Sequence, residues 1–235
     1  MSIAAIAVQL AELHEGAGFR AARFDAGEPF AGRVAVLPSA FNPPTRAHLG
    51  LLDIARATEG ITGTAALLTT NNVDKSLFGA PLSHRVGMLL AAHEENPGLA
   101  VLGTNAARLV DQGEALAIAF SGITFDFVVG FDTLIRVFDA KYYEDMPRTL
   151  DRFFERHRLI ATNRAQATVE AVQDYLREPL VRDFGHRIVV CELDAGHAAL
   201  SSTQARAAHS SGEDSDALTP AVAAYIREHR LYGRT

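Results

Sequence analysis

A chain of 235 residues with 48% hydrophobic and 21% charged residues has the composition of an ordinary globular protein, which excludes a largely disordered one. Its 22 basic and 28 acidic residues give a formal net charge of −6, which disfavours the broad cationic face needed for general binding to nucleic acid or an anionic membrane. The single cysteine, Cys191, cannot form an internal disulfide, so the composition fits a reducing compartment and predicts a cytoplasmic protein.

The first expected element is an amphipathic helix near the N-terminus. Apolar residues recur there at three- and four-residue spacing, as they do on one face of a helix: Ile3, Ile6, Leu10 and Leu13. The segment has no basic leading region and reaches Glu12 early. Neither a signal peptide nor a membrane span is therefore expected.

The rest of the chain alternates predicted strands and helices. Short apolar, β-branched runs predict strands, and apolar residues at helical spacing predict helices. In chain order, the expected elements are a strand at 33–38, a helix at 47–57, a strand at 64–69, a helix at 83–95, a strand at 99–103, a helix at 106–119, strands at 124–130 and 158–162, a helix at 167–177, a strand at 186–192, and helices at 203–210 and 220–229.

This alternation predicts an α/β fold. Strands that alternate with helices of ten or more residues form βαβ units, whose parallel sheet is covered by helices on both faces. We therefore expect a doubly wound parallel sheet that ends in two C-terminal helices. Residues 1–32 are interpreted as an N-terminal helical extension and residues 33–235 as the main domain.

Several common catalytic and nucleotide-binding motifs are misplaced or absent. The G-x-G-x-x-A run at 16–21 follows a helical pattern and not a strand, so we interpret it as a helix end and loop. This disfavours an NAD-dependent dehydrogenase. His93 and Glu94 begin like a zincin motif, but Pro97 stands where its second histidine belongs. The sequence contains neither a G-x-S-x-G elbow nor a P-loop.

The turn between the first predicted strand of the sheet and its helix is the most informative segment. Ligands of doubly wound sheets bind at the carboxyl ends of strands, where a helix N-terminus attracts phosphate. Pro43 and Pro44 stiffen this turn, and Thr45 is expected to cap the helix. His48 then falls in the first helical turn, within reach of a bound anion. From spacing alone, an ordinary cap at Thr45 and a half-buried polar His48 explain the pattern equally well.

Four stretches, in the same order along the chain, resemble a known family. Residues 39–48 read S-A-F-N-P-P-T-R-A-H and resemble the (H/T)-x-G-H signature of the nucleotidylyltransferase superfamily, above all the G-S-F-N-P-x-T-x-x-H form of nicotinamide-mononucleotide adenylyltransferases. The other three are N-N-V-D-K at 71–75 followed by His84, Arg85 and Met88, then G-F-D-T-L at 130–134, and L-S-S-T-Q-A-R at 200–206. The resemblance covers residues 33–230.

The resemblance implies a Rossmann-like nucleotidylyltransferase fold and adenylyl transfer from ATP. The implied acceptor is a pyridine mononucleotide, either nicotinamide or nicotinate mononucleotide, whose phosphate attacks ATP directly and releases pyrophosphate. Mg²⁺ is implied as the ion that accompanies ATP, without a protein cage of carboxylates. The implied partners are ATP and this small mononucleotide, with no nucleic acid and no membrane, and a homo-oligomer is left open.

The resemblance also assigns site residues. Its implied catalytic residues are His48, Thr45 and Arg206. The residues implied to bind ATP are His48 and Arg206 together with Ser39, Ala40, Phe41, Ser201, Ser202 and Thr203. The residues implied to bind the acceptor or the leaving group are Asn71, Lys75, Arg85, Gly130 and Asp132. Taken singly, Ser201, Ser202 and Thr203 are also explained as ordinary helix-cap residues, Arg206 and Lys75 as solvated charges, and Asp132 as a helix cap. Only the common order of the four stretches favours a site.

The sequence departs from the family pattern in ways that bear on the acceptor. Ala47 and Ser39 stand where the family has glycine. The chain has no tryptophan, although the family often stacks one on the pyridine ring, and Phe78, Phe120 and Tyr142 are the candidates to replace it. A phosphopantetheine or cytidylyl transferase of the same superfamily therefore remains an alternative, as does a nucleotide-binding regulator without turnover.

Overall fold

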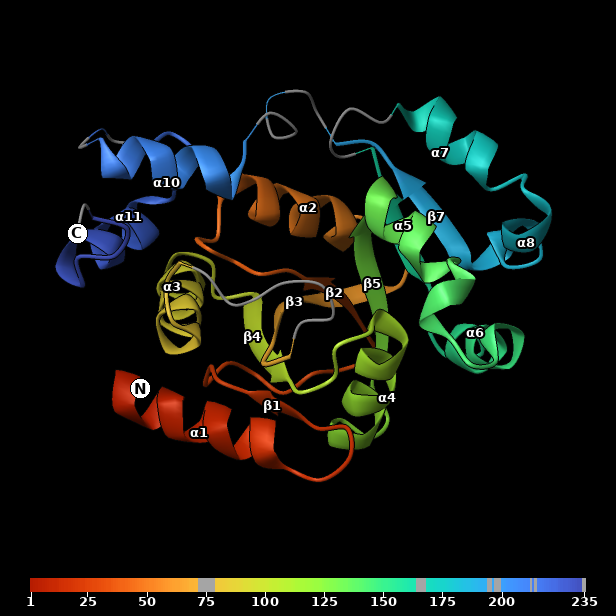
Figure 1. Ribbon diagram of the computed structural model, residues 1–235, viewed down its shortest axis with the longest axis horizontal. Coiled ribbons are helices and arrows are strands. Elements are labelled where there is room, and N and C mark those ends of the chain that lie inside the picture. The colour runs from red at the N-terminus through yellow and green to blue at the C-terminus, as the bar shows by residue number, and fades with distance from the viewer. Residues whose placement is uncertain are drawn as a thin grey trace.

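The computed structural model describes residues 1–71, 79–163, 168–193, 196, 200–211, 213 and 215–233. Seven strands within them form one sheet, in the order β1-β4-β3-β2-β5-β6-β7. The strands are β1 (Ala21–Arg23), β2 (Arg33–Pro38), β3 (Ile61–Thr69), β4 (Leu99–Thr104), β5 (Thr124–Gly130), β6 (Leu159–Thr162) and β7 (Ile188–Cys191). Figure 1 shows the sheet in the middle of the molecule, with helices on both sides.

The helices of the described residues connect these strands or flank the sheet. The α-helices are α1 (Ile3–Glu15), α2 (Arg46–Arg56), α3 (Leu82–Glu95), α4 (Leu109–Ala119), α5 (Phe131–Val137), α6 (Met146–Phe154), α7 (Val169–Tyr175), α8 (Pro179–Arg182), α10 (Ser202–Ser210) and α11 (Pro220–Glu228). Two short 3₁₀ helices are η1 (Ala140–Tyr142) and η2 (Gly185–Arg187). None of the described helices combines the length and the apolar character required to cross a membrane.

The sheet is doubly wound, as the sequence predicts. The central strand β2 pairs in parallel with β3 on one side and with β5 on the other. The pairs β3–β4, β5–β6 and β6–β7 are also parallel, and only the edge strand β1 runs antiparallel to its neighbour. The chain order therefore reverses beside β2, and in such sheets the crevice at that reversal, outside the carboxyl ends of the strands, is where ligands bind.

Alternate residues of the central strands build two separate hydrophobic cores. Ala35 and Leu37 of β2 face the core formed with α1, α2, α3 and α11. Val34 and Val36 face the opposite core, formed with α4, α5, α6 and α7. All four side chains are at most 3% exposed. This burial on both faces explains why β2 is a continuous apolar run and not an alternating one.

The structure corrects the bounds of some expected elements. The helix expected at 106–119 begins at Leu109, because Ala106 is held at the strand ends by Thr69, whose hydroxyl donates to its carbonyl, and by Thr104, whose hydroxyl accepts from its amide. The strand expected at 186–192 covers only 188–191, and a 3₁₀ turn precedes it. The helix expected at 167–177 covers 169–175, and residue 167 lies outside the described residues.

The N-terminal segment is attached to the sheet at two places. Helix α1 buries Ile6 and Leu10 in the same core as α3, and β1 extends the sheet by pairing with β4. The glycine-rich run at 16–21 ends α1, with Gly16 as its C-cap and Gly18 at a φ of 69°. This confirms a helix end in place of a dinucleotide fingerprint. A domain boundary at residue 32 stays a prediction.

A buried carboxylate joins three neighbouring strands near their amino ends. Asp126 of β5 is fully buried and accepts from the guanidinium of Arg33, at the start of β2. It also accepts from Arg158, just before β6, through the main-chain N–H at 3.0 Å and through Nε at 2.9 Å. The two guanidinium side chains remain 27% and 21% exposed. Both positive charges are thus partly solvated, whereas the negative charge is compensated entirely within the protein.

A second buried polar side chain gives the fold an expected pH dependence. His157 is 4% exposed, and its Nδ1–H donates to the carbonyl of Phe125 over 2.7 Å. Burial lowers the pKa of His157, although this hydrogen bond and Asp126 act in the opposite direction. The unfolded chain therefore takes up the proton more readily, so the stabilisation is present above about pH 6.5 and is lost as the pH falls through the folded pKa.

We accordingly expect the free energy of unfolding in urea to decrease from pH 7 to pH 5. The decrease should be shallower in His157→Gln, which has no imidazole to protonate. Each protein is compared with itself at pH 7, so any general loss of stability in the variant does not enter the comparison. Equal slopes for the two proteins would show that His157 does not control this titration.

Candidate functional site

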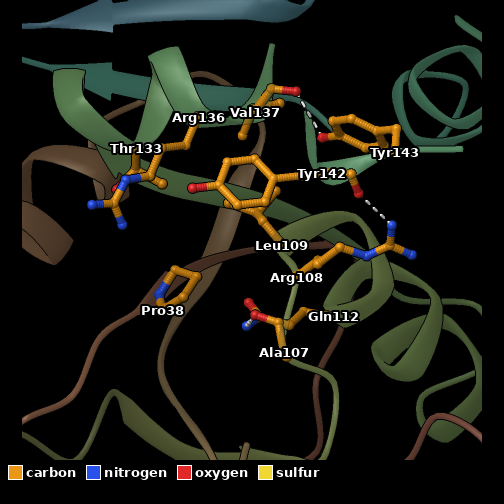
Figure 2. Close-up of a pocket in the computed structure, with 10 residues that line it drawn as sticks. All are labelled: Pro38, Ala107, Arg108, Leu109, Gln112, Thr133, Arg136, Val137, Tyr142 and Tyr143. Carbon is orange, nitrogen blue, oxygen red and sulfur yellow. Dashed lines mark hydrogen bonds between the residues drawn. The ribbon is translucent and has the colours of Figure 1, made fainter. Parts of the chain in front are cut away.

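The candidate site lies at the carboxyl ends of the central strands. Pro38 ends β2, and the loop of residues 39–45 leads from it into α2. A cavity of about 170 Å³ opens beside Pro38, between the start of α4 and the segment that contains α5 and η1. Figure 2 shows this cavity, which is lined by Pro38, Ala107, Arg108, Leu109, Gln112, Thr133, Arg136, Val137, Tyr142 and Tyr143. Both loop and cavity are thus at the reversal of strand order, where the fold predicts a ligand.

His48 is held in one tautomer at the start of α2. Thr45 is the N-cap and His48 the third helical residue, as the sequence predicts. The Thr45 main-chain N–H donates to His48 Nδ1 over 3.0 Å, and the Thr45 hydroxyl lies 2.8 Å from the same nitrogen. Because an amide N–H can only donate, Nδ1 is the acceptor and the ring proton is on Nε2. His48 therefore presents an Nε2–H donor, although the imidazole is only 3% exposed.

Ser39 shows where this donor points. Its hydroxyl lies 3.1 Å from His48 Nε2 and accepts a hydrogen bond from Nε2–H, at the point where the chain leaves β2. Phe41 packs against the imidazole with a ring-centroid distance of 5.0 Å, and its own φ is 44°. The donor is thus directed at Ser39, and the Phe41 ring packs against the imidazole.

Helix α10 is brought against this loop from the far end of the sequence. Ser201 caps α10 by accepting from the Gln204 N–H. The Ser202 hydroxyl donates to the Pro43 carbonyl over 2.8 Å, so Ser202 is a loop contact and not the second cap that the sequence suggested. The guanidinium of Arg206 donates to the Asn42 carbonyl and to the Thr203 hydroxyl. The structure therefore brings together the first and the last of the four stretches, with the start of α10 against the loop that leads into α2 (Figure 1).

Arg85 supports the same loop from behind. It lies on α3 with 4% exposure and donates to the carbonyls of Ala80 and Ala40, over 2.8 Å and 3.2 Å. Burial lowers the pKa of Arg85, and Arg206 acts in the same direction, which indicates that the two guanidinium groups are close. In this structure Arg85 is thus hydrogen-bonded to the main chain of the loop of residues 39–45 and of the segment just before α3.

The other residues predicted to bind the acceptor differ in their positions, and one of them is not described by the structure. The Asn71 side chain donates to the Asn105 carbonyl over 2.8 Å and so joins the ends of β3 and β4. Gly130 ends β5 and is the N-cap of α5, and Asp132 is exposed in the first turn of that helix. Lys75 lies outside the described residues, as does the whole segment 72–78.

Of the three aromatic residues considered as replacements for tryptophan, only Tyr142 lines the cavity in the described part of the chain. Phe120 packs instead against Phe30 and Phe125, near the amino end of β5, which makes it wrong as a stacking residue at the site. Phe78 lies outside the described residues. In Figure 2 the Tyr142 ring lies across the cavity from Pro38.

The cavity also contains residues that sequence reasoning missed. Arg108 donates to the Tyr142 carbonyl over 2.7 Å, and its charge is compensated by Asp111, whose carboxylate lies 2.6 Å from Nε. Tyr143 donates to the Val137 carbonyl over 2.7 Å, which anchors η1 to α5. Gln112 is 5% exposed, and its Oε1 has no hydrogen-bond partner among the residues that the structure describes. The available signal was that Arg108 and Gln112 follow β4 and that Tyr143 follows β5 and α5, because strand ends on this side recruit ligands.

The described residues hold no cluster of three or more histidine, cysteine, aspartate or glutamate side chains that could bind a metal ion. What the loop offers is a set of donors. Two helix N-termini, a fixed imidazole N–H and a guanidinium converge on it from α2 and α10. Such a set stabilises negative charge on phosphate oxygens, and it can do so locally in a chain of net negative charge.

Comparison with known proteins points to one family. No family model matches the chain. The chain is 30% identical over 194 residues to a Schizosaccharomyces pombe (strain 972 / ATCC 24843) protein named "Putative nicotinamide mononucleotide adenylyltransferase", and the match covers 76% of this chain and 76% of that protein.

Two solved structures share the fold. Plasmodium falciparum nicotinic acid mononucleotide adenylyltransferase complexed with NaAD matches with a TM-score of 0.65 at 16% identity, over 86% of this chain and 98% of the other. The same enzyme complexed with APC matches with a TM-score of 0.63, at the same identity and coverage. At 16% identity these two likenesses show the architecture, whereas the yeast protein provides the sequence relationship.

Proposed function

Because the chain belongs to the nicotinamide mononucleotide adenylyltransferase family and is a nucleotidyltransferase, we propose that it transfers the adenylyl group of ATP to a pyridine mononucleotide. The observation that carries the proposal is the buried His48, whose Nε2–H is fixed as a donor in the first turn of α2, beside the loop that α10 contacts. The acceptor is nicotinamide or nicotinate mononucleotide, and the products are the corresponding dinucleotide and pyrophosphate.

The proposed reaction is a direct displacement at phosphorus. A 5′-phosphate oxygen of the mononucleotide forms a bond to the α-phosphorus of ATP, while the bond from this phosphorus to the oxygen bridging to the β-phosphate breaks. The electron pair of that bond leaves with pyrophosphate. Such a transfer requires mainly positioning and stabilisation of charge on the phosphate oxygens.

The chain's own residues supply that stabilisation. His48 Nε2–H would move from the Ser39 hydroxyl to an α-phosphate oxygen and donate to it as charge develops, and Thr45 keeps Nδ1 unprotonated so that this donor persists. Arg206 would donate to the β- and γ-phosphates beside the N-terminus of α10. The main chain of residues 39–41 would enclose the triphosphate, with Arg85 behind it.

We propose Mg²⁺ as the ion that accompanies ATP. Triphosphate oxygens are its ordinary ligands, and when bound it would neutralise part of their charge. We assign it no ligand from the protein, since the donors described around the loop are N–H and O–H groups suited to anions.

The cavity beside Pro38 is the proposed site for the pyridine ring. Tyr142 lies across it and offers an aromatic face, so it takes the place that tryptophan holds in other members of the family. Thr133, Arg136 and Val137 of α5, the helix that Gly130 caps, line this cavity. The acceptor would thus enter from the β5 side and ATP from the α2 side, with their phosphates meeting near Pro38.

One assay tests the proposed function against its alternatives. The protein is incubated with ATP, Mg²⁺ and, separately, nicotinamide mononucleotide, nicotinate mononucleotide or phosphopantetheine, and with CTP in place of ATP. Pyrophosphate is followed and each product is identified by mass. Dinucleotide formation from either pyridine mononucleotide supports the proposal. Turnover only with phosphopantetheine or CTP would assign another transferase, and ATP binding without any turnover would assign a regulator.

Replacing Tyr142 by alanine tests the proposed acceptor site. We expect KM for the pyridine mononucleotide to rise about tenfold, because aromatic stacking contributes about 1 to 1.5 kcal/mol. KM for ATP should stay within about twofold, since the triphosphate lies on the other side of Pro38. Tyr142→Phe keeps the ring and should recover most of the lost affinity. An unchanged acceptor KM in Tyr142→Ala would remove Tyr142 from the site.

A further inference from the structure

The segment that follows α11 returns to the loop that carries the proposed phosphate donors. The Tyr232 hydroxyl lies 2.7 Å from Oδ1 of Asn42, a residue 190 positions earlier. An amide oxygen can only accept, so the phenol is the donor. The preceding Leu231 is buried at 9% exposure, which anchors the segment in the core beside α3.

The backbone of this segment adopts a conformation that side chains disfavour. Arg230 has a φ of 50° and Tyr232 a φ of 61°, in the left-handed region that favours glycine. Neither residue is glycine, so surrounding contacts must hold both in place. The hydrogen bond to Asn42 is one of those contacts, and it reaches the loop.

Asn42 is the point at which several parts of the site meet. Its Oδ1 also accepts from the Ala80 N–H over 3.2 Å, and its carbonyl accepts from Arg206. Only glycine fits at position 79, where a Cβ would lie 2.4 Å from Nδ2 of Asn42. The Asn42 amide is therefore confined from two sides, with Tyr232 supplying one donor and the Ala80 main chain the other.

The Tyr232 hydroxyl is suited to act as a lasting donor. Burial raises the pKa of Tyr232, and the nearby charges of Arg85 and Arg206 lower it by less. The phenol therefore keeps its proton at neutral pH, even though two cations surround it. Both guanidinium groups that influence this pKa, those of Arg85 and Arg206, also donate to carbonyls of the loop of residues 39–45.

We infer that Tyr232 is a positioning residue for adenylyl transfer: by fixing the Asn42 amide, it sets the place of the loop carbonyl that orients Arg206 and of the turn that leads to His48. This inference rests on the proposed function. Loss of the hydroxyl would still leave Asn42 Oδ1 with the Ala80 N–H. The loop should therefore remain folded but lose its constraint on the side of Arg206.

The variant Tyr232→Phe removes this one hydroxyl. We expect kcat to fall about tenfold and KM for ATP to rise severalfold, because small displacements of positioning groups reduce the rate strongly. KM for the pyridine mononucleotide should stay within about twofold, which separates a local effect on the triphosphate from a general loss of structure.

Tyr225→Phe is the matched control. Tyr225 lies on α11, and its hydroxyl is 3.2 Å from His84 Nδ1 on α3, so this variant also removes one phenol hydrogen bond at the C-terminal helix but none to the loop. Its kcat should stay within about twofold of the wild type. Equal losses of kcat and of melting temperature in the two variants would overturn the inference, as would a Tyr232→Phe enzyme with kcat within about twofold of the wild type.

A double-mutant cycle tests the route through Asn42. If Tyr232 acts through this amide, the change from Tyr to Phe should have little further effect in an Asn42→Ala background. Full additivity would contradict the inference. Should the wild type adenylylate no acceptor, the proposed function fails, and ATP affinity measured by calorimetry becomes the readout. Tyr232→Phe should then bind ATP severalfold more weakly than Tyr225→Phe, and equal affinities would refute the positioning role.

Discussion

Replacing His48 by alanine should lower kcat for adenylyl transfer by about 10²–10³-fold, the usual effect of removing a preorganised donor to a developing oxyanion. KM for ATP should stay within about twofold, because this donor is needed most as charge develops in the transition state. Preorganisation is visible in the structure, where Thr45 fixes Nδ1 as an acceptor and leaves the proton on Nε2. Steady-state kinetics with saturating acceptor measure both parameters.

The control for this experiment is His186→Ala. His186 is an exposed histidine in η2, at the amino end of β7 and away from the loop, so its loss should leave kcat within about twofold of the wild type. The stability of both variants should also be measured by urea denaturation, because His48 contacts the N-cap Thr45 and its loss can weaken the start of α2. A folded His48→Ala enzyme with nearly full activity would show that the imidazole does not touch the reacting phosphate.

The variant Asp126→Asn should lower the free energy of unfolding by about 3 kcal/mol, the lower end of the range for breaking a buried ion pair. The carboxylate is fully buried and receives hydrogen bonds from Arg33 and from Arg158. An amide in its place keeps one acceptor but turns an NH₂ group toward a guanidinium, which can only donate. We choose the lower end because both guanidinium side chains are partly exposed and regain some water.

Denaturation in urea at pH 7 measures this loss, and Asp174→Asn is its control. Asp174 pairs with Arg177 on the surface, where the two side chains are 70% and 75% exposed, so its replacement should change the stability by no more than about 0.5 kcal/mol. If Asp126→Asn cost less than about 1 kcal/mol, the three strands would not depend on this carboxylate.

The doubly wound sheet could be predicted because most of its strands have a clear pattern of apolar residues in the sequence. β2, β4 and β5 are buried on both faces and thus read as short runs of mainly apolar residues, interrupted in β5 by the buried Asp126. β1 has only three half-buried residues, too few to show a period, and it exists because β4 offers an edge. Its position could not be read from local pattern.

The missed helices have different explanations. α6 carries a recognisable signal, since Asp145 caps it, a proline follows at its start and its buried residues recur at helical spacing. It was missed although the pattern was present. α5 begins directly after β5, with Gly130 as its N-cap and no intervening loop, so its sequence merges with that of the strand.

In the candidate site, too, contacts between residues close in the sequence could be predicted, whereas contacts between distant segments could not. Thr45 and His48 are three residues apart, and their relation follows from helix geometry. The approach of Arg206 to Asn42, and of Tyr142 to Pro38, depends on how distant segments pack. Sequence reasoning reached Arg206 only through resemblance to a family, and it offered Tyr142 only as one of three candidates.

The hydrogen bond between Tyr232 and Asn42 also orders events during synthesis. A ribosome releases Asn42 long before Tyr232, and contacts across so many positions form late because the intervening chain must first be ordered. The parallel strands from β2 to β7 can all pair before residue 232 exists. A nascent chain at that stage can form its sheet but lacks the hydrogen bond from Tyr232 to Asn42, so the loop of residues 39–45 can gain this contact only once the last residues have been made.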